Sequence, residues 1–290
     1  MMNVVTSIAE TRALCRSLRT APGTTLGLVP TMGALHEGHL SLVRAAKRSC
    51  GHVAVSVFVN PTQFGPNEDL ARYPRTLEAD CALLQAEGVD LVFAPSAAAM
   101  YPTGGLSTFV DPGELGTRLD GRSRPGHFRG VATVVTKLFH IVQPDRAFFG
   151  QKDAAQVAVL RRMVTDLDLP VEVVVGPTVR DADGLALSSR NQFLTPGQRT
   201  EALRLSQALQ CARRAIEGGV RDTGVVVEKM RGHLESPDLV IDYVEAVDAD
   251  TLLPQQNVGE STLLAVAAWL GDVRLIDNLP VRDVLPVQAL

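Results

Sequence analysis

The 290-residue sequence has few cysteines, and none of them is spaced as in a metal-binding or redox motif. The four that occur, Cys15, Cys50, Cys81 and Cys211, are scattered and form no CxxC pair. Scattered thiols are typical of free cysteines in a reducing compartment and argue against a disulfide scaffold or a cysteine-ligated zinc site. We therefore expect a cytoplasmic protein.

Long apolar runs and blocks of one charge sign are also lacking. The longest apolar run near the C-terminus, Leu263–Leu270, is far shorter than the roughly 20 residues of a membrane-spanning helix. Acidic and basic side chains interrupt the first twenty residues, which do not resemble a signal peptide. The net charge is −4, with no Lys/Arg-rich block. These features argue against a nucleic acid or an anionic membrane as the main partner.

What is present is the composition of a globular protein with a sizeable core, 46% hydrophobic and 21% charged. Strand-like apolar runs alternate with helical patterns through residues 1–180, which predicts βαβ units and a parallel sheet. The expected strands are Leu26–Val29, Val53–Val59, Leu91–Ala94, Ala147–Phe149 and Val171–Val175.

The pattern changes at a turn-rich segment, Asp181–Gly184. Beyond it, Thr195–Gln198 has the form of a capping box with proline at the first helical position, and Gly218-Gly219 would end that helix. A further helix (Val225–Leu234) and three strands (Leu239–Val247, Ser261–Leu270 and Asp272–Ile276) are expected, the last two strands as a hairpin around Gly271. We predict an α/β protein with a Rossmann-like parallel-sheet domain at 1–180 and a small α+β domain at 181–290.

The most informative segment follows the first expected strand, where His36-Glu37-Gly38-His39 opens a helix. Helix N-termini beyond the carboxyl ends of parallel strands bind anions, and two histidines three apart can both donate to phosphate oxygens there. Zinc is the rival ligand, but the HExxH arrangement needs histidines four apart inside a helix. Two loop histidines with ordinary hydrogen bonds are the other alternative.

Five collinear blocks carry a family resemblance. They are Val29–Leu42, Phe58–Gly65, Arg124–Val131, Phe149–Asp153 and Asp183–Asn191. In order and spacing they resemble the pantothenate synthetase (pantoate–β-alanine ligase) family of the HxGH nucleotidyltransferase superfamily. The resemblance implies ATP-dependent ligation of pantoate and β-alanine through a pantoyl adenylate, with release of AMP and pyrophosphate, in coenzyme A precursor biosynthesis. It also implies a C-terminal domain that acts as a lid, a homodimer, and Mg²⁺ that enters with ATP rather than at a resident metal site.

The same resemblance places phosphate-binding and catalytic residues in three of the blocks: His36, His39, Lys152, Ser188, Ser189 and Arg190. Further expected ATP contacts are Met32, Gly33, Gly150, Asp153, Val179 and Leu187. Lys152 is one of only four lysines among 28 basic residues, which favours a compact charge at a phosphate over a solvated loop lysine. Helix capping by Asp153 and an ordinary polar turn at Ser188–Asn191 remain alternatives.

For pantoate and β-alanine the expected residues are Pro30, Met32, Asn60, Gln63, Tyr73, Arg124 and Gln156. An uncharged amide such as that of Gln63 can donate to the substrate hydroxyl and accept from it, although loop glutamines are often only solvated. Ala155 stands where many family members have a second glutamine. Asp80 and Asp120 are candidate carboxylates near Mg²⁺, with a surface role the expected alternative, and Leu138–Val142 suits either a dimer interface or the core.

Two other functions fit parts of the pattern. One is an enzyme of the same superfamily that transfers AMP to a phosphorylated substrate and ignores pantoate. The other is a non-catalytic nucleotide sensor, which would bind ATP and never form AMP.

Overall fold

The computed structural model describes residues 2–66, 68–102 and 106–284. The chain divides into two compact units. The N-terminal unit comprises 1–150 and 159–177, and the C-terminal unit comprises 151–158 and 178–290. The division therefore assigns the segment Gln151–Ala158 to the C-terminal unit, although it follows a strand of the N-terminal unit in the sequence.

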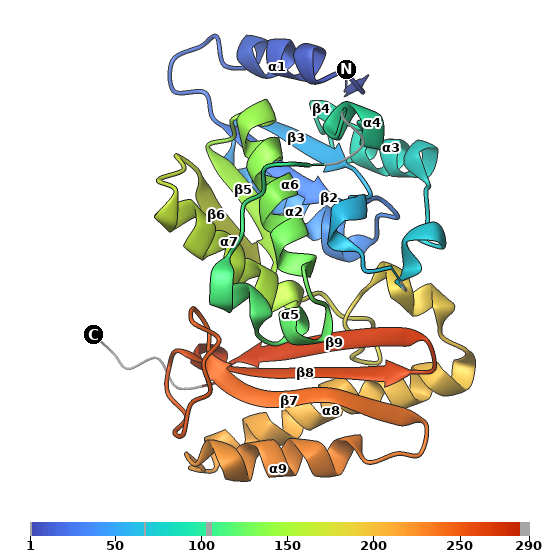
Figure 1. Ribbon diagram of the computed structural model, residues 1–290, viewed down its shortest axis with the longest axis vertical. Coiled ribbons are helices and arrows are strands. Elements are labelled where there is room, and N and C mark those ends of the chain that lie inside the picture. Colours follow the sequence, from blue (N-terminus) through green and yellow to red (C-terminus); the bar gives the residue numbers. More distant parts are fainter. Residues whose placement is uncertain (1, 67, 103–105, 285–290) are drawn as a thin grey trace. The chain divides into compact units, whose positions relative to one another are not determined.

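A six-stranded parallel sheet forms the centre of the N-terminal unit (Figure 1). Its strands are β1 (Asn3–Val5), β2 (Leu26–Thr31), β3 (His52–Val57), β4 (Leu91–Phe93), β5 (Arg146–Gly150) and β6 (Glu172–Gly176), in the spatial order β1-β4-β3-β2-β5-β6. Leu26, Leu28 and Val29 of β2 are fully buried. Continuous burial explains why the central strands have runs of apolar residues rather than an alternating pattern.

Helices connect these strands: α1 (Ile8–Ser17), α2 (Glu37–Ser49), α3 (Leu77–Ala86), α4 (Ala97–Met100), α5 (Asp120–Ser123), α6 (His127–Val142) and α7 (Ala154–Asp166), with α7 crossing the unit boundary. Leu40, Val43 and Ala46 of α2 are buried, at the three-residue spacing of one helix face. They belong to a core cluster that also contains Val29, Val55 and Val92.

The strand order reverses between β2 and β5. From β2 the chain builds β3 and β4 on one side and then returns to place β5 on the other side of β2. Such a switch point is where open α/β sheets bind ligands, beyond the carboxyl ends of the strands. The HxGH segment directly follows β2, and Gly150 is the last residue of β5.

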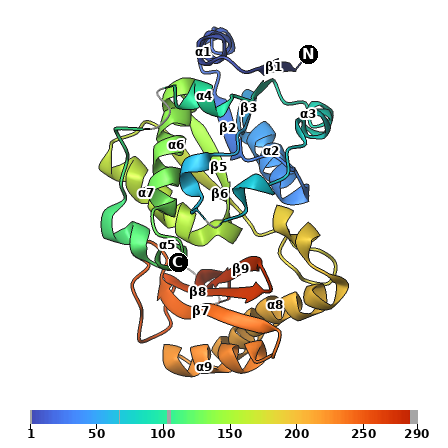
Figure 2. The same cartoon turned by 45° about the vertical axis from the view of Figure 1, so that its right-hand side comes forward.

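The C-terminal unit has a three-stranded antiparallel sheet of β7 (Leu239–Asp248), β8 (Thr262–Leu270) and β9 (Val273–Pro280). Helices α8 (Pro196–Glu217) and α9 (Thr223–Leu234) pack on this sheet (Figures 1 and 2). Thr195 and Gln198 form the predicted capping box, and Gly218-Gly219 ends α8. Leu205, Leu209 and Ile216 bury the inner face of α8 in a core shared with β8 and β9.

The predicted fold class is confirmed, because a parallel α/β sheet is followed by a small α+β unit. The five expected strands of the first part all occur, with ends shifted by one or two residues. The short edge strand β1 was not expected. In the stretch Leu138–Val142 of α6, the four apolar side chains are buried within a single chain, which indicates core, whereas His140 is exposed. In the described ranges, every helix is too short or too polar to cross a bilayer.

Candidate functional site

The turn after β2 has an unusual backbone. Gly33 has φ +83° and the following Ala34 has φ +51°, so two successive residues adopt the left-handed conformation. Only glycine adopts this conformation at no steric cost, which explains Gly33 but makes Ala34 a strained position. The surroundings must therefore stabilise the turn.

A buried carboxylate stabilises it. Asp80 on α3 is 2% exposed, and its two oxygens accept hydrogen bonds from the backbone N–H groups of Ala34 (3.0 Å) and Leu35 (2.9 Å). The Thr76 hydroxyl donates to the same carboxylate at 3.3 Å. Charge-assisted bonds of this kind are about twice as strong as neutral ones. The start of the HxGH segment is thus fixed by a residue more than forty positions away in the sequence.

His36 and His39 cap their own helix. The Gly38 N–H donates to Nδ1 of His36 (3.2 Å), and the His36 N–H donates to Nδ1 of His39 (3.3 Å). The two rings lie together, with centroids 4.1 Å apart. Because each Nδ1 is an acceptor, the proton of each neutral imidazole is on Nε2. Both histidines are therefore held as Nε2–H donors at the positive end of α2.

Gln63 lies in a second group of polar side chains, on the short 3₁₀ helix Pro61–Gln63 after β3. Its Oε1 accepts from Nδ2 of Asn60 (3.0 Å), and its Nε2 contacts Sδ of Met32 (3.3 Å). Asn60 is 1% exposed, and its Oδ1 accepts from the Tyr101 hydroxyl (2.6 Å). This network fixes the amide orientation of Gln63, with Nε2 as its donor beside Met32.

Arg124 and His127 hold the backbone of Gln63. His127 Nδ1 donates to the Gln63 carbonyl oxygen at 2.8 Å, which leaves His127 Nε2 to accept from Arg124 Nη1 at 3.0 Å. Arg124 also makes a two-pronged ion pair with Glu68. Burial and the neighbouring Arg124 charge lower the pKa of His127 to about 4. Burial would raise the pKa of Glu68, but its bonds to Arg124 lower it overall.

Gly130 on α6 allows the helix to approach this turn closely. A Cβ atom at Gly130 would lie 2.3 Å from the Thr62 carbonyl oxygen and 2.7 Å from Cα of Gln63, both far inside contact distance. The Gly130 carbonyl oxygen accepts a bond from Asn60 Nδ2 (3.2 Å). Any larger residue at this position would move the backbone of Gln63.

Six of the seven residues expected to bind pantoate or β-alanine lie in the N-terminal unit. The structure links four of them, Met32, Asn60, Gln63 and Arg124, in the contacts above. Pro30 lies in β2, close in sequence to Met32. Tyr73 is buried and packs edge-on against Phe64, the residue after Gln63, with ring centroids 6.0 Å apart. Gln156 is in α7, within the C-terminal unit.

Among the other expected nucleotide contacts, Gly150 lies in the N-terminal unit at the end of β5, and the remainder lie in the C-terminal unit. Lys152 and Asp153 end the 3₁₀ helix Gln151–Asp153, with Lys152 Nζ 3.8 Å from Asp153 Oδ1. The Val179 carbonyl oxygen accepts from the Leu187 N–H (2.9 Å). Ser188 caps the 3₁₀ helix Ser189–Phe193, its Oγ accepting from the Arg190 N–H at 3.2 Å.

The supporting role of His127 was not predicted from the sequence, and the burial of two aspartates was misjudged. His127 lies inside the matched Arg124–Val131 block, so the block itself was the available signal. Asp80 and Asp120 are 2% and 6% exposed, so the expected surface role is wrong for both. Among the described residues, no three His, Cys, Asp or Glu side chains are placed to hold a metal ion.

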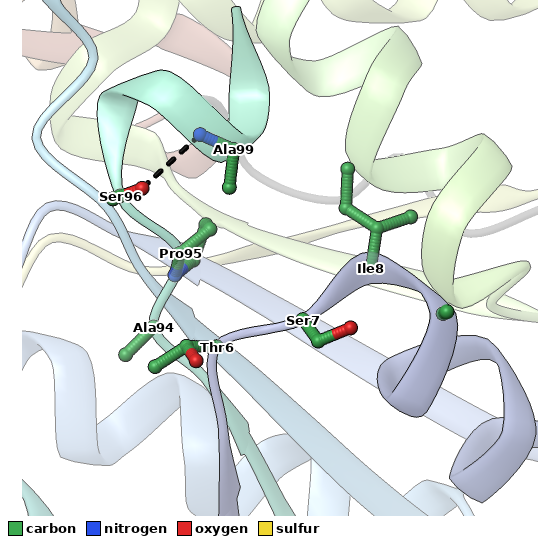
Figure 3. Close-up of a pocket in the computed structure, with 8 residues that line it drawn as sticks. Thr6, Ser7, Ile8, Ala94, Pro95, Ser96 and Ala99 are labelled. Atoms are coloured by element: carbon green, nitrogen blue, oxygen red, sulfur yellow. Dashed lines mark hydrogen bonds between the residues drawn. The ribbon is translucent and has the colours of Figure 1, made fainter. Parts of the chain in front are cut away.

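A hollow of about 700 Å³ lies elsewhere, beyond the ends of β1 and β4 (Figure 3). Its lining comprises Thr6, Ser7, Ile8, Ala9, Ala94, Pro95, Ser96 and Ala99. None of these side chains is charged, and the Ser96 hydroxyl is used to cap α4 through the Ala99 N–H. No charged side chain lines the hollow, whereas two histidines and Gln63 follow β2 and β3, so the polar residues at the ends of β2 and β3 are the better candidate.

The protein thus has a parallel α/β sheet, with fixed hydrogen-bond donors beyond the carboxyl ends of β2 and β3. Proteins of this class bind small-molecule ligands at that position. Comparison with known proteins identifies the family. The profile described as pantoate-beta-alanine ligase matches residues 3–280. The chain belongs to the pantoate–β-alanine ligase family.

Individual relatives agree with the profile. A pantothenate synthetase of Koribacter versatilis is 55% identical over 279 residues, which cover 96% of this chain and 95% of the relative. A bifunctional pantoate ligase/cytidylate kinase of Thermosynechococcus vestitus is also 55% identical, but the match spans only 53% of its length.

Solved structures have the same fold. Pantothenate synthetase of Thermus thermophilus matches with a TM-score of 0.90 and 48% identity, covering 97% of this chain and 99% of that one. A pantoate-beta-alanine ligase of Francisella tularensis, solved with an ATP compound and β-alanine, matches with a TM-score of 0.79 and 34% identity, covering 97% and 98%.

Proposed function

We propose that the protein ligates (R)-pantoate and β-alanine to pantothenate at the cost of ATP, through pantoyl adenylate. The observation that carries this proposal is the family match over residues 3–280, which includes the HxGH segment at the switch point of the sheet. The Francisella relative, solved with an ATP compound and β-alanine, supports these two substrates. The product is a coenzyme A precursor.

In the first step, a carboxylate oxygen of pantoate attacks the α-phosphorus of ATP. The bond from that phosphorus to the α,β-bridging oxygen breaks, and pyrophosphate leaves with the electron pair. Negative charge grows on the bridging oxygen, so the step needs fixed donors more than a nucleophilic side chain. His36 and His39 are suited to this role because their Nδ1 acceptors leave the proton on Nε2.

Lys152, Ser188, Ser189 and Arg190 supply further phosphate donors from the C-terminal unit in this proposal. Met32, Gly33, Gly150, Asp153, Val179 and Leu187 complete the ATP contacts. Residues 181–290 act as a lid over the nucleotide, and residues 1–180 bind nucleotide and pantoate. Closure of such a lid would exclude water from the adenylate.

Pantoate binds beside Gln63 in this scheme. Because Asn60 holds Oε1 of Gln63, the Nε2 group is the donor presented to an oxygen of the substrate. Pro30, Met32 and Phe64 provide apolar surface for the methyl groups of pantoate. Tyr73, Arg124 and Gln156 contribute further contacts to the substrates. In the second step the neutral β-alanine amine attacks the acyl carbon, the bond to the AMP oxygen breaks, and the amine proton is lost.

Three further properties belong to the proposal. ATP enters as its Mg²⁺ complex, with the metal held mainly by phosphates and water. The protein works as a homodimer. It works in the cytoplasm, and its four free thiols support a reducing compartment.

Isotope exchange between pyrophosphate and ATP tests the proposal directly. Without β-alanine, exchange that requires pantoate would establish the adenylate and its acyl donor. Exchange with a phosphorylated substrate in place of pantoate would assign the chain to AMP transfer instead. ATP binding with no exchange under either condition would leave a nucleotide sensor and contradict the proposed ligase.

A further inference from the structure

The Lys152 turn is held by an asparagine from the far end of the sequence. Asn278, on β9, is 5% exposed. Its Nδ2 donates to the backbone carbonyl oxygens of Gln151 and Lys152, both at 2.9 Å. Its Oδ1 accepts from Nε2 of Gln151 at 3.0 Å. All three residues belong to the C-terminal unit.

This contact requires a carboxamide in one orientation. The two N–H groups of Asn278 serve two consecutive backbone carbonyls, while its oxygen serves the side chain of Gln151. A reversed amide would place its oxygen against both carbonyl oxygens. Two fixed successive carbonyls define the peptide plane on each side of Lys152, and hence the direction in which its side chain leaves the backbone.

Asp277, which precedes Asn278 in β9, holds a second segment that the proposed function places at the nucleotide. Asp277 is 3% exposed and accepts two bonds from Arg180, at 2.6 and 2.8 Å. Arg180 Nη1 also donates to the Gly184 carbonyl oxygen at 3.1 Å, and the Leu187 N–H donates to the Val179 carbonyl oxygen, so the loop between Val179 and Leu187 is held at its middle and at its ends. Successive residues of one strand therefore anchor both the Lys152 turn and the loop that leads to Ser188.

We infer that Asn278 is a positioning residue for Lys152, which directs the ammonium group toward the phosphates of a nucleoside triphosphate. The inference rests on the proposed function, because that proposal assigns Lys152 to the phosphates. It adds that the anchor of this lysine is the C-terminal sheet, so the Lys152 turn and the Ser188–Arg190 segment belong to one structural body.

The test is Asn278→Asp, which keeps the shape and the acceptor oxygen but replaces the donor group by an oxygen that repels both carbonyls. We expect kcat/KM for ATP in pantoate-dependent pyrophosphate exchange to fall by about 10²-fold, the effect of a small misplacement of a catalytic group. The KM for pantoate should stay near that of the unchanged protein. Asn257→Asp is the matched control, because it makes the same chemical change at an exposed position of the same unit.

A double-mutant cycle with Lys152→Ala separates positioning from general destabilisation. If Asn278 acts through Lys152, Asn278→Asp costs little in the Lys152→Ala background. An equal loss in both backgrounds would overturn the inference while leaving the proposed function intact. If Lys152→Ala alone leaves exchange unchanged, the phosphate role of Lys152 is wrong and the inference fails with it. Should Asn278→Asp not fold, Asn278→Ser removes the carboxamide without adding charge and is measured in the same cycle.

Discussion

Asp80 offers a sharp test of how the HxGH segment is positioned. In Asp80→Asn, an amide NH2 group, which cannot accept a hydrogen bond, replaces one carboxylate oxygen. The N–H groups of Ala34 and Leu35 are bound to different oxygens, so either amide orientation leaves one of them facing a donor. The Asp80 side chain is buried, so water cannot easily replace the lost bond.

The size of the effect follows from these contacts. A hydrogen bond to a charged group contributes about 1.5–3 kcal/mol, and a buried unsatisfied N–H adds a desolvation cost of similar size. We expect Asp80→Asn to lower the free energy of unfolding by about 3–6 kcal/mol, the sum of these two contributions. Because the same turn precedes His36, we also expect kcat in pyrophosphate exchange to fall by about 10²-fold at temperatures where the variant is folded.

Denaturant unfolding and pyrophosphate exchange measure the two effects on the same sample. Asp90→Asn is the matched control. Asp90 also accepts a backbone N–H bond, from Val53 at 2.9 Å, but it lies at the amino ends of β3 and β4, whereas the HxGH segment follows the carboxyl end of β2. Asp80 does not position the HxGH segment for catalysis if Asp80→Asn unfolds more easily yet keeps full turnover. The same conclusion holds if Asp90→Asn loses as much turnover as Asp80→Asn.

Three more predictions concern the same unit. His36→Ala and His39→Ala should each lower kcat by about 10²–10³, the scale of a lost transition-state donor, and steady-state kinetics near the unchanged rate for both would contradict the phosphate role. Gln63→Ala should raise KM for pantoate more than KM for ATP, whereas equal changes in initial-rate measurements would argue against pantoate binding there. For His127, the pKa is about 4 in the folded protein and 6.5 unfolded, so the unfolded state binds more protons between these values. The free energy of unfolding should therefore fall, by at most about 3 kcal/mol, as the pH drops from 6.5 to 4. In His127→Asn that part of the pH dependence should disappear from denaturation curves.

The fold was largely predictable because its signals are local. Buried strands of the parallel sheet have apolar runs, and the Thr195–Gln198 capping box marks the start of α8. The edge strand β1 was not predictable, because Asn3–Val5 is too short to show a pattern and depends on pairing with β4. Thr76 illustrates a different limit. Threonine before a helix commonly caps it with the side chain, but the Thr76 hydroxyl donates to Asp80 instead.

The candidate site was predictable only where a motif marks it. The residues of the matched blocks could be named, but their supports could not. Asp80 and Asn278 bind backbone groups far away in the sequence, and no spacing rule connects Asn278 to a turn 126 residues earlier. Such contacts depend on tertiary structure, so a local pattern cannot reveal them.

The close approach of α6 to the Gln63 turn restricts how this protein can change. With the Thr62 carbonyl oxygen 2.3 Å from where a Cβ would lie, position 130 admits no side chain at all unless the Gln63 backbone moves. The neighbouring Arg129 is exposed and free of that restriction. Single substitutions at exposed positions of α6 such as Arg129 can therefore accumulate without moving the Gln63 backbone. A side chain at position 130 would therefore also shift the Gln63 turn, where we propose that pantoate binds.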